Sequence, residues 1–114
     1  MFIVEYNAKF IPPIEFTIDY NPLHTFNNTD YMGASLMTFV NLFKKHDYFL
    51  VCCNSFTGSN AFFVKNQYRS LFPEVPDDID RIWCPPMYFL PPDYGHGNSP
   101  RTVEVILREL QKDV

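Results

Sequence analysis

The sequence predicts a small α/β fold. Three strands form a single mixed sheet, and one helix connects the first strand to the second. Apolar runs at 2–6, 48–53 and 61–64 have the length and composition of strands. A helical apolar periodicity separates the first two runs. This order is typical of a right-handed crossover between parallel strands, and the short connection to the third run predicts an antiparallel return.

One domain is expected, and its composition is that of a folded protein. The chain has 114 residues, of which 46% are hydrophobic and 19% charged. Acidic residues (13) outnumber basic ones (9), which argues against nucleic acid as a partner because phosphate binding needs a basic surplus. The apolar runs are shorter than the ~20 residues that span a bilayer, and the first residues lack the basic region of a signal peptide. We therefore expect a cytoplasmic protein with reduced cysteines and no membrane contact.

The first run, 2–6, is predicted to be a buried strand because it is apolar and β-branched. Residues 8–30 follow as a loop, interrupted by prolines and ending in a cluster of turn formers. Within this loop, residues 14–18 alternate between apolar and polar, which fits one short extra strand. A helix is predicted over 31–46, with Asp30 as its N-cap. Its apolar face consists of Leu36, Phe39, Val40 and Phe43.

The run 48–53 is apolar on both faces, which predicts a central strand covered on both sides. Residues 57–60 form a turn, and 61–64 return as the third strand. We divide the chain into 1–66 and a proline-rich part, 67–114, packed on the same core. The second part is an irregular excursion that ends in a helix. That helix begins with Ser99 as N-cap and Pro100 at its first position, and its predicted apolar face is Val103, Ile106, Leu107 and Leu110.

Few residues form a pattern that indicates chemistry. The three histidines have no ligand at a metal-site spacing, and the neighbours Cys52 and Cys53 point to opposite faces of a strand. Glu5, Tyr6 and Asn7 are polar residues at the carboxyl end of a strand, where ligands bind in open α/β sheets. Two interpretations stay open for Glu5: it contacts a substrate, or it binds loop amides from 8–30.

Several segments together resemble the C-terminal half of FkbM-type, class I S-adenosylmethionine-dependent methyltransferases. The resemblance covers about residues 2–66, and its most specific pieces are the Asp-Tyr-x-Gly-Ala-Ser-Leu and Gly-x-Asn-Ala-Phe-Phe-Val stretches. The segments are Glu5-Tyr6-Asn7-Ala8-Lys9-Phe10, Tyr20-Asn21-Pro22, Thr29-Asp30-Tyr31-Met32-Gly33-Ala34-Ser35-Leu36, Cys53-Asn54 and Gly58-Ser59-Asn60-Ala61-Phe62-Phe63-Val64.

The resemblance implies part of a Rossmann-like sheet whose full strand order is 3-2-1-4-5-7-6. Residues 2–6 would be strand five, 31–46 the crossover helix, and 48–54 and 61–65 strands six and seven, giving the partial order 5-7-6. Asp47 departs from the glycine expected before the 48–54 strand.

The donor-binding elements of that family precede strand five, so the resemblance implies no cofactor for this chain alone. It makes Glu5, Tyr6, Asn7, Asp30 and Tyr31 candidate contacts to the methyl acceptor, with no residue assigned as catalytic base. We expect a methyltransferase-related half domain that is inactive alone. The alternatives are a standalone binding or scaffold protein built on a remnant of that fold, and an enzyme of another kind that uses the strand-end carboxylates.

The strand 2–6 would lack its neighbour, strand four, and its open edge invites association. Three solutions are considered: a homodimer through this edge, coverage of the edge by residues 71–98, or a separate N-terminal half.

Overall fold

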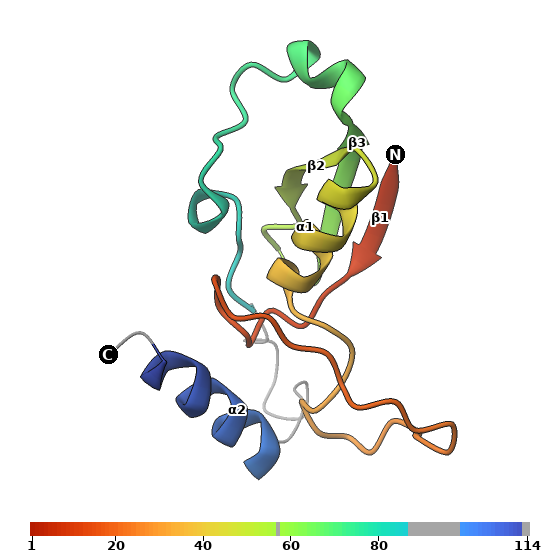
Figure 1. Ribbon diagram of the computed structural model, residues 1–114, viewed down its shortest axis with the longest axis vertical. Coiled ribbons are helices and arrows are strands. Elements are labelled where there is room, and N and C mark those ends of the chain that lie inside the picture. Colours follow the sequence, from red (N-terminus) through yellow and green to blue (C-terminus); the bar gives the residue numbers. More distant parts are fainter. Residues whose placement is uncertain (57, 87–98, 113–114) are drawn as a thin grey trace.

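The computed structural model describes residues 1–56, 58–86 and 99–112. A three-stranded sheet carries one helix on its face, an irregular segment runs along the side of the sheet opposite β1, and a second helix lies below (Figure 1). The elements in chain order are β1 (Phe2–Glu5), α1 (Leu36–Lys45), β2 (Tyr48–Cys53), β3 (Asn60–Lys65), the 3₁₀ helices η1 (Asn66–Leu71) and η2 (Ile79–Arg81), and α2 (Pro100–Gln111). The small α/β fold class is thereby confirmed. Within these residues, no helix is long and apolar enough to cross a membrane.

The sheet has the order β1-β3-β2, and both of its strand pairs are antiparallel. The expectation of a mixed sheet is therefore wrong for the hydrogen-bonded pairs, because β3 separates the two strands that the crossover makes parallel. The prediction that 48–53 is the central strand is also wrong. β3 is central, and the outer side of β2 is covered by 66–82, where for example the Phe49 and Phe72 rings lie 6.0 Å apart. An apolar run indicates that both faces of a strand are covered, but it does not indicate which element covers them.

Strand β1 lies at the edge of the sheet and is not buried as predicted. Phe2 is 49% and Ile3 55% exposed, and the strand ends at Glu5, one residue earlier than expected. The Phe2 ring packs against Phe43 and Tyr48, and the half-buried Val4 packs against the core. Among the described residues no strand pairs with its outer edge.

Helix α1 begins five residues later than predicted, and its N-cap is Ser35. The Ser35 hydroxyl accepts a hydrogen bond from the Thr38 N–H at 3.3 Å. The preceding residues stay outside the helix because they bond to the 16–18 segment: the Ser35 N–H donates to the Phe16 carbonyl, and a single bridge joins Thr17 to Ala34. The extra strand expected at 14–18 is therefore reduced to this single bridge.

Two apolar clusters form the interior. The first joins the sheet to α1 and to residues 75–84, around Leu36, Leu50 and Phe63. The second is built on the loop after β1, where the Phe10 and Phe16 rings stack at 3.9 Å and pack against Val105 of α2. The C-terminal helix thus packs on the loop that follows the first strand.

Helix α2 starts as predicted, with Ser99 at the N-cap and Pro100 at the first position. Of its predicted apolar face, Ile106 packs against the second cluster, but the other three residues do not dock. Thr102 and Val105 are the buried residues, and the larger apolar side chains Val103, Leu107 and Leu110 are about half exposed. Periodicity identified the helix but not the side that docks, because both sides carry apolar residues.

The described part of the proline-rich segment, 67–86, packs on the β2 side of the sheet. The Cys84 thiol lies 3.8 Å from the Cys53 carbonyl oxygen, and Leu71, Phe72 and Val75 line a hollow with β2. This part does not cover the outer edge of β1, which lies on the other side of the molecule (Figure 1). Residues 87–98 of the expected cover lie outside the described residues.

Candidate functional site

A small pocket opens where β1 ends. Glu5, Tyr6 and Asn7 line it together with Met32 and Gly33, and its volume is about 190 Å³. Backbone hydrogen bonds fix the turn: the Tyr6 N–H donates to the Ser59 carbonyl at 2.7 Å and the Asn7 N–H to the Ala34 carbonyl at 2.8 Å. Three of the five sequence-predicted residues therefore share one pocket.

The Asn7 amide is buried and holds the chain around it. Its Nδ2 donates to the carbonyl oxygens of Asp30 at 2.7 Å and Met32 at 3.1 Å, and its Oδ1 accepts the Lys9 N–H at 3.2 Å. Both N–H groups and the oxygen are thus engaged within the protein. Asn7 shapes the pocket by fixing residues 30–32 against the end of β1.

Tyr6 has a buried ring, 3% exposed, and its hydroxyl donates to the Cys84 carbonyl at 3.2 Å. Burial raises the pKa of this phenol far above its ordinary value, and the neighbouring Cys53 thiol adds to the shift. The hydroxyl therefore stays protonated and ties the β1 end to the 82–84 segment. It is a poor general base.

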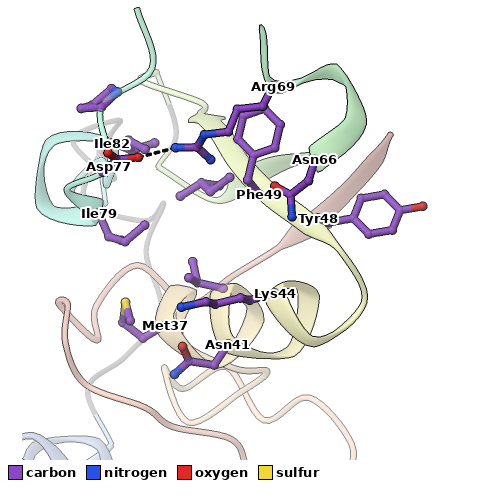
Figure 2. A pocket seen from close by; sticks show the side chains of 13 residues that line it. Met37, Asn41, Lys44, Tyr48, Phe49, Asn66, Arg69, Asp77, Ile79 and Ile82 are labelled. Atoms are coloured by element: carbon purple, nitrogen blue, oxygen red, sulfur yellow. Dashed lines mark hydrogen bonds and ion pairs between the residues drawn. The ribbon is translucent and has the colours of Figure 1, made fainter. Parts of the chain in front are cut away.

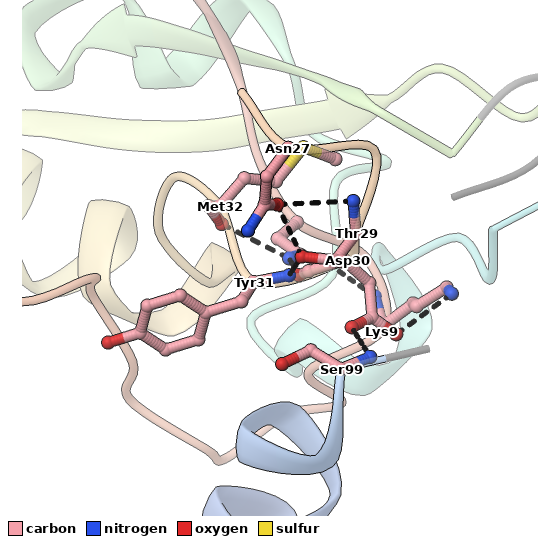
Figure 3. Close-up of polar contacts among 8 residues, drawn as sticks. Lys9, Asn27, Thr29, Asp30, Tyr31, Met32 and Ser99 are labelled. Carbon is pink, nitrogen blue, oxygen red and sulfur yellow. Dashed lines mark hydrogen bonds and ion pairs between the residues drawn. The ribbon is translucent and has the colours of Figure 1, made fainter. Parts of the chain in front are cut away.

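Asp30 and Tyr31 lie outside the lining of this pocket. The buried Asp30 carboxylate forms an ion pair with the Lys9 ammonium at 3.0 Å and accepts the Ser99 N–H at 2.7 Å (Figure 3). Burial alone would raise the pKa of Asp30, but the Ser99 N–H and the Lys9 charge outweigh it, so the pKa lies below the ordinary aspartate value. The Tyr31 hydroxyl contacts Asp19 instead, 3.4 Å from its Oδ2.

Of the three predicted residues that line the pocket, Glu5 is the accessible one, because Tyr6 and Asn7 are buried. Glu5 lines the pocket and is exposed, and within the described residues its carboxylate forms no ion pair. A carboxylate in this position can accept a hydrogen bond from a hydroxyl or amino group of a bound molecule.

The cysteines do not form a reactive centre in the described chain. Cys52 is exposed and Cys53 is buried, so the two neighbouring thiols have different surroundings. Burial raises the pKa of the Cys53 thiol to about 11, so it remains protonated at neutral pH. His24 and His46 are exposed, and His96 lies outside the described residues. No group of three or more metal-ligating side chains comes together in the part of the chain that the structure describes.

A second, larger cavity lies between α1, β2 and the 66–82 segment (Figure 2). It measures about 430 Å³ and is lined by Met37, Val40, Asn41, Lys44, Tyr48, Phe49, Leu50, Asn66, Arg69, Pro76, Asp77, Ile79 and Ile82. Sequence reasoning did not identify it. Lys44 was interpreted only as a helix-end charge, and Arg69 reaches Asp77 across an irregular segment that has no periodic signal.

Comparison of the chain with protein-family models, with curated proteins and with solved structures gives no significant match in any of the three.

Proposed function

We propose that this chain is a cytoplasmic, methyltransferase-related half domain that forms the acceptor side of a cleft and has no S-adenosylmethionine site of its own. One observation carries the proposal. Strands β1 and β2 are joined by the crossover helix α1, and β3 lies antiparallel between them. This is the arrangement of strands five, seven and six in the family that the sequence resembles.

The pocket at the end of β1 supports the acceptor role. In that family the loop after strand five lies near the methyl acceptor, and here the exposed Glu5 lines the pocket at the end of β1. We propose Glu5 as the acceptor contact. Tyr6, Asn7 and Asp30 position the pocket, because their polar groups already bind protein groups. Tyr31 contacts the acceptor in this proposal only if its bond to Asp19 opens.

The outer edge of β1 is the proposed place of association. In the family strand four occupies that position, and among the described residues no strand does. Exposed Phe2 and Ile3 flank the unpaired backbone groups. We propose that a second copy of the chain or a separate N-terminal half pairs here.

Calorimetric titration with S-adenosylmethionine tests the proposal. The chain alone should give no heat of binding, and adding a polypeptide that carries the missing donor-binding half should restore saturable binding. Tight, saturable binding by the chain alone would overturn the half-domain proposal. The edge is tested separately, by light scattering.

A standalone binding or scaffold protein is the second candidate, favoured by the way the C-terminal helix is built in. Val105 packs on the loop after β1, and Asp30 binds the backbone at the start of α2. A chain that unfolds cooperatively and binds no donor with or without an added N-terminal half would favour this second function.

A further inference from the structure

We propose that the cavity between α1 and residues 66–82 binds a small organic monoanion with an apolar body, such as an alkyl or aryl carboxylate. This proposal is independent of the methyltransferase relationship. The cavity lies on the β2 side of the sheet and shares no lining residue with the pocket at the end of β1.

The size and walls of the cavity suit such a ligand. Its volume of about 430 Å³ falls in the range of roughly 300–1,000 Å³ that is typical of small-molecule sites. Apolar surface comes from α1, β2 and η2. The side chains that supply it are Val40, Leu50, Ile79 and, directly after η2, Ile82. Figure 2 shows Met37 and Ile79 on facing sides of the space. An alkyl chain or ring would remove this surface from water.

The charges that line the cavity sum to one positive charge. The Arg69 guanidinium pairs with Asp77 and lies over the Phe49 ring, 4.7 Å from its centroid, so its charge is already compensated. The Lys44 ammonium forms no ion pair within the described residues and lies along the cavity wall (Figure 2). Among the described residues that line the cavity, Asp77 is the one carboxylate, and Glu15, which accepts the Asn41 amide, lies outside the lining. One uncompensated cation beside apolar walls favours a monoanion.

The helix end alone does not explain this lysine. Lys44 and Lys45 both lie in the last turn of α1, where any cation interacts favourably with the helix dipole. Lys44 lines the cavity, and Lys45 does not. Changing Lys44 or Lys45 alone therefore separates the two roles. Both substitutions remove a charge from the same turn, but only the one at Lys44 changes the cavity.

Titration with octanoate, followed by the backbone amide shifts of α1 and η1 in nuclear magnetic resonance spectra, tests the proposal. We expect saturable shifts with octanoate and weaker binding of 1-octanol by up to about fivefold, the scale of one partly exposed ion pair. Lys44→Met should weaken octanoate binding by about the same factor, whereas Lys45→Met should leave it unchanged. Asp77→Asn should strengthen octanoate binding because it frees the Arg69 charge, and Asp77 is 93% exposed, so this variant keeps the fold.

Three results would overturn the proposal. These are the absence of saturable octanoate shifts at the cavity, equal affinities for octanoate and octanol, and equal losses in Lys44→Met and Lys45→Met. The spectrum of each variant before titration shows whether it is folded. If Lys44→Met were unfolded, Asp77→Asn would decide, since unchanged or weaker octanoate binding there contradicts the proposed charge balance.

Discussion

The Asp30 carboxylate accepts a hydrogen bond from the backbone N–H of Ser99 at 2.7 Å, although the two residues are 69 positions apart in the chain. The same carboxylate pairs with Lys9, which follows the end of β1 (Figure 3). Asp30 therefore joins the first strand's loop to the first turn of α2. Such a buried carboxylate is stable because each oxygen has a donor.

Replacing Asp30 by Asn should destabilise the protein by about 2 kcal/mol, the scale of a buried hydrogen bond to a charged group. The substitution preserves the shape of the side chain but removes the carboxylate charge that pairs with the Lys9 ammonium. Urea unfolding measures the effect. Glu109→Gln is the control because the Glu109 carboxylate pairs with Lys112 on α2, away from Asp30, and it should change the unfolding free energy far less than Asp30→Asn does. Equal effects of the two substitutions would contradict the role given to Asp30.

The same carboxylate should make stability depend on pH in the acid range. The pKa of Asp30 is lower in the folded protein than in the unfolded chain, so its stabilisation is complete above the unfolded value of about 4. It is lost as the pH falls through the folded pKa, because the carboxylate must then take up a proton. The difference in unfolding free energy between the wild type and Asp30→Asn should therefore shrink below about pH 4. A difference that stays constant from neutral to acid pH would be the contrary result.

Gly58 and Gly33 form a matched pair for testing how the 84–86 segment docks. Both have a positive φ, of 62° and 60°. A Cβ on Gly58 would overlap the Pro85 carbonyl oxygen, whereas a Cβ on Gly33 would meet no heavy atom within 4 Å. Gly33→Ala should cost about 1 kcal/mol for the left-handed backbone. Gly58→Ala should cost roughly 1–3 kcal/mol more, because backbone must move. Thermal and urea unfolding measure both variants, and equal costs would mean that residue 58 does not contact Pro85.

Elements defined by local signals were the part of the fold that the sequence could predict. Pro100 after Ser99 marks the start of α2, and the apolar spacing of Leu36 and Phe43 marks α1. These local signals could not predict the position of each strand in the sheet. Phe2 is as apolar as a core residue, yet it is half exposed on an edge strand. The burial of an edge strand depends on a neighbouring strand, and the described residues supply none for the outer edge of β1.

The candidate site, too, could be predicted only in part. The strand-end position placed Glu5, Tyr6 and Asn7 together at one pocket. Residue type did not reveal that the Asn7 amide is used up by backbone groups more than 20 residues away. The larger cavity depends on an irregular segment folding over β2, which brings Arg69 above Phe49. No periodic pattern encodes such a path.

Asp47 holds the left-handed position between α1 and β2 at a φ of 65°, where the family resemblance would place glycine. Its side-chain oxygen accepts the Asn66 amide at 2.9 Å, which offsets part of the backbone cost. Asp47→Ala loses this bond and keeps the strain, so it should be less stable than Asp47→Gly by about 1 kcal/mol. Urea unfolding of the two variants gives the comparison. Greater stability of the alanine variant would show that the turn has another conformation in solution.

The open edge of β1 gives the last prediction. If two copies pair along this edge, light scattering should show a dimer whose population rises with protein concentration. Ile3→Lys places a charge on the exposed strand and should shift the chain to monomer, because lysine on an edge strand opposes pairing. Ile11→Lys is the control, since Ile11 is also exposed but lies in the loop after the strand. A wild-type monomer whose β1 amides exchange rapidly with solvent would exclude both a dimer and a covered edge.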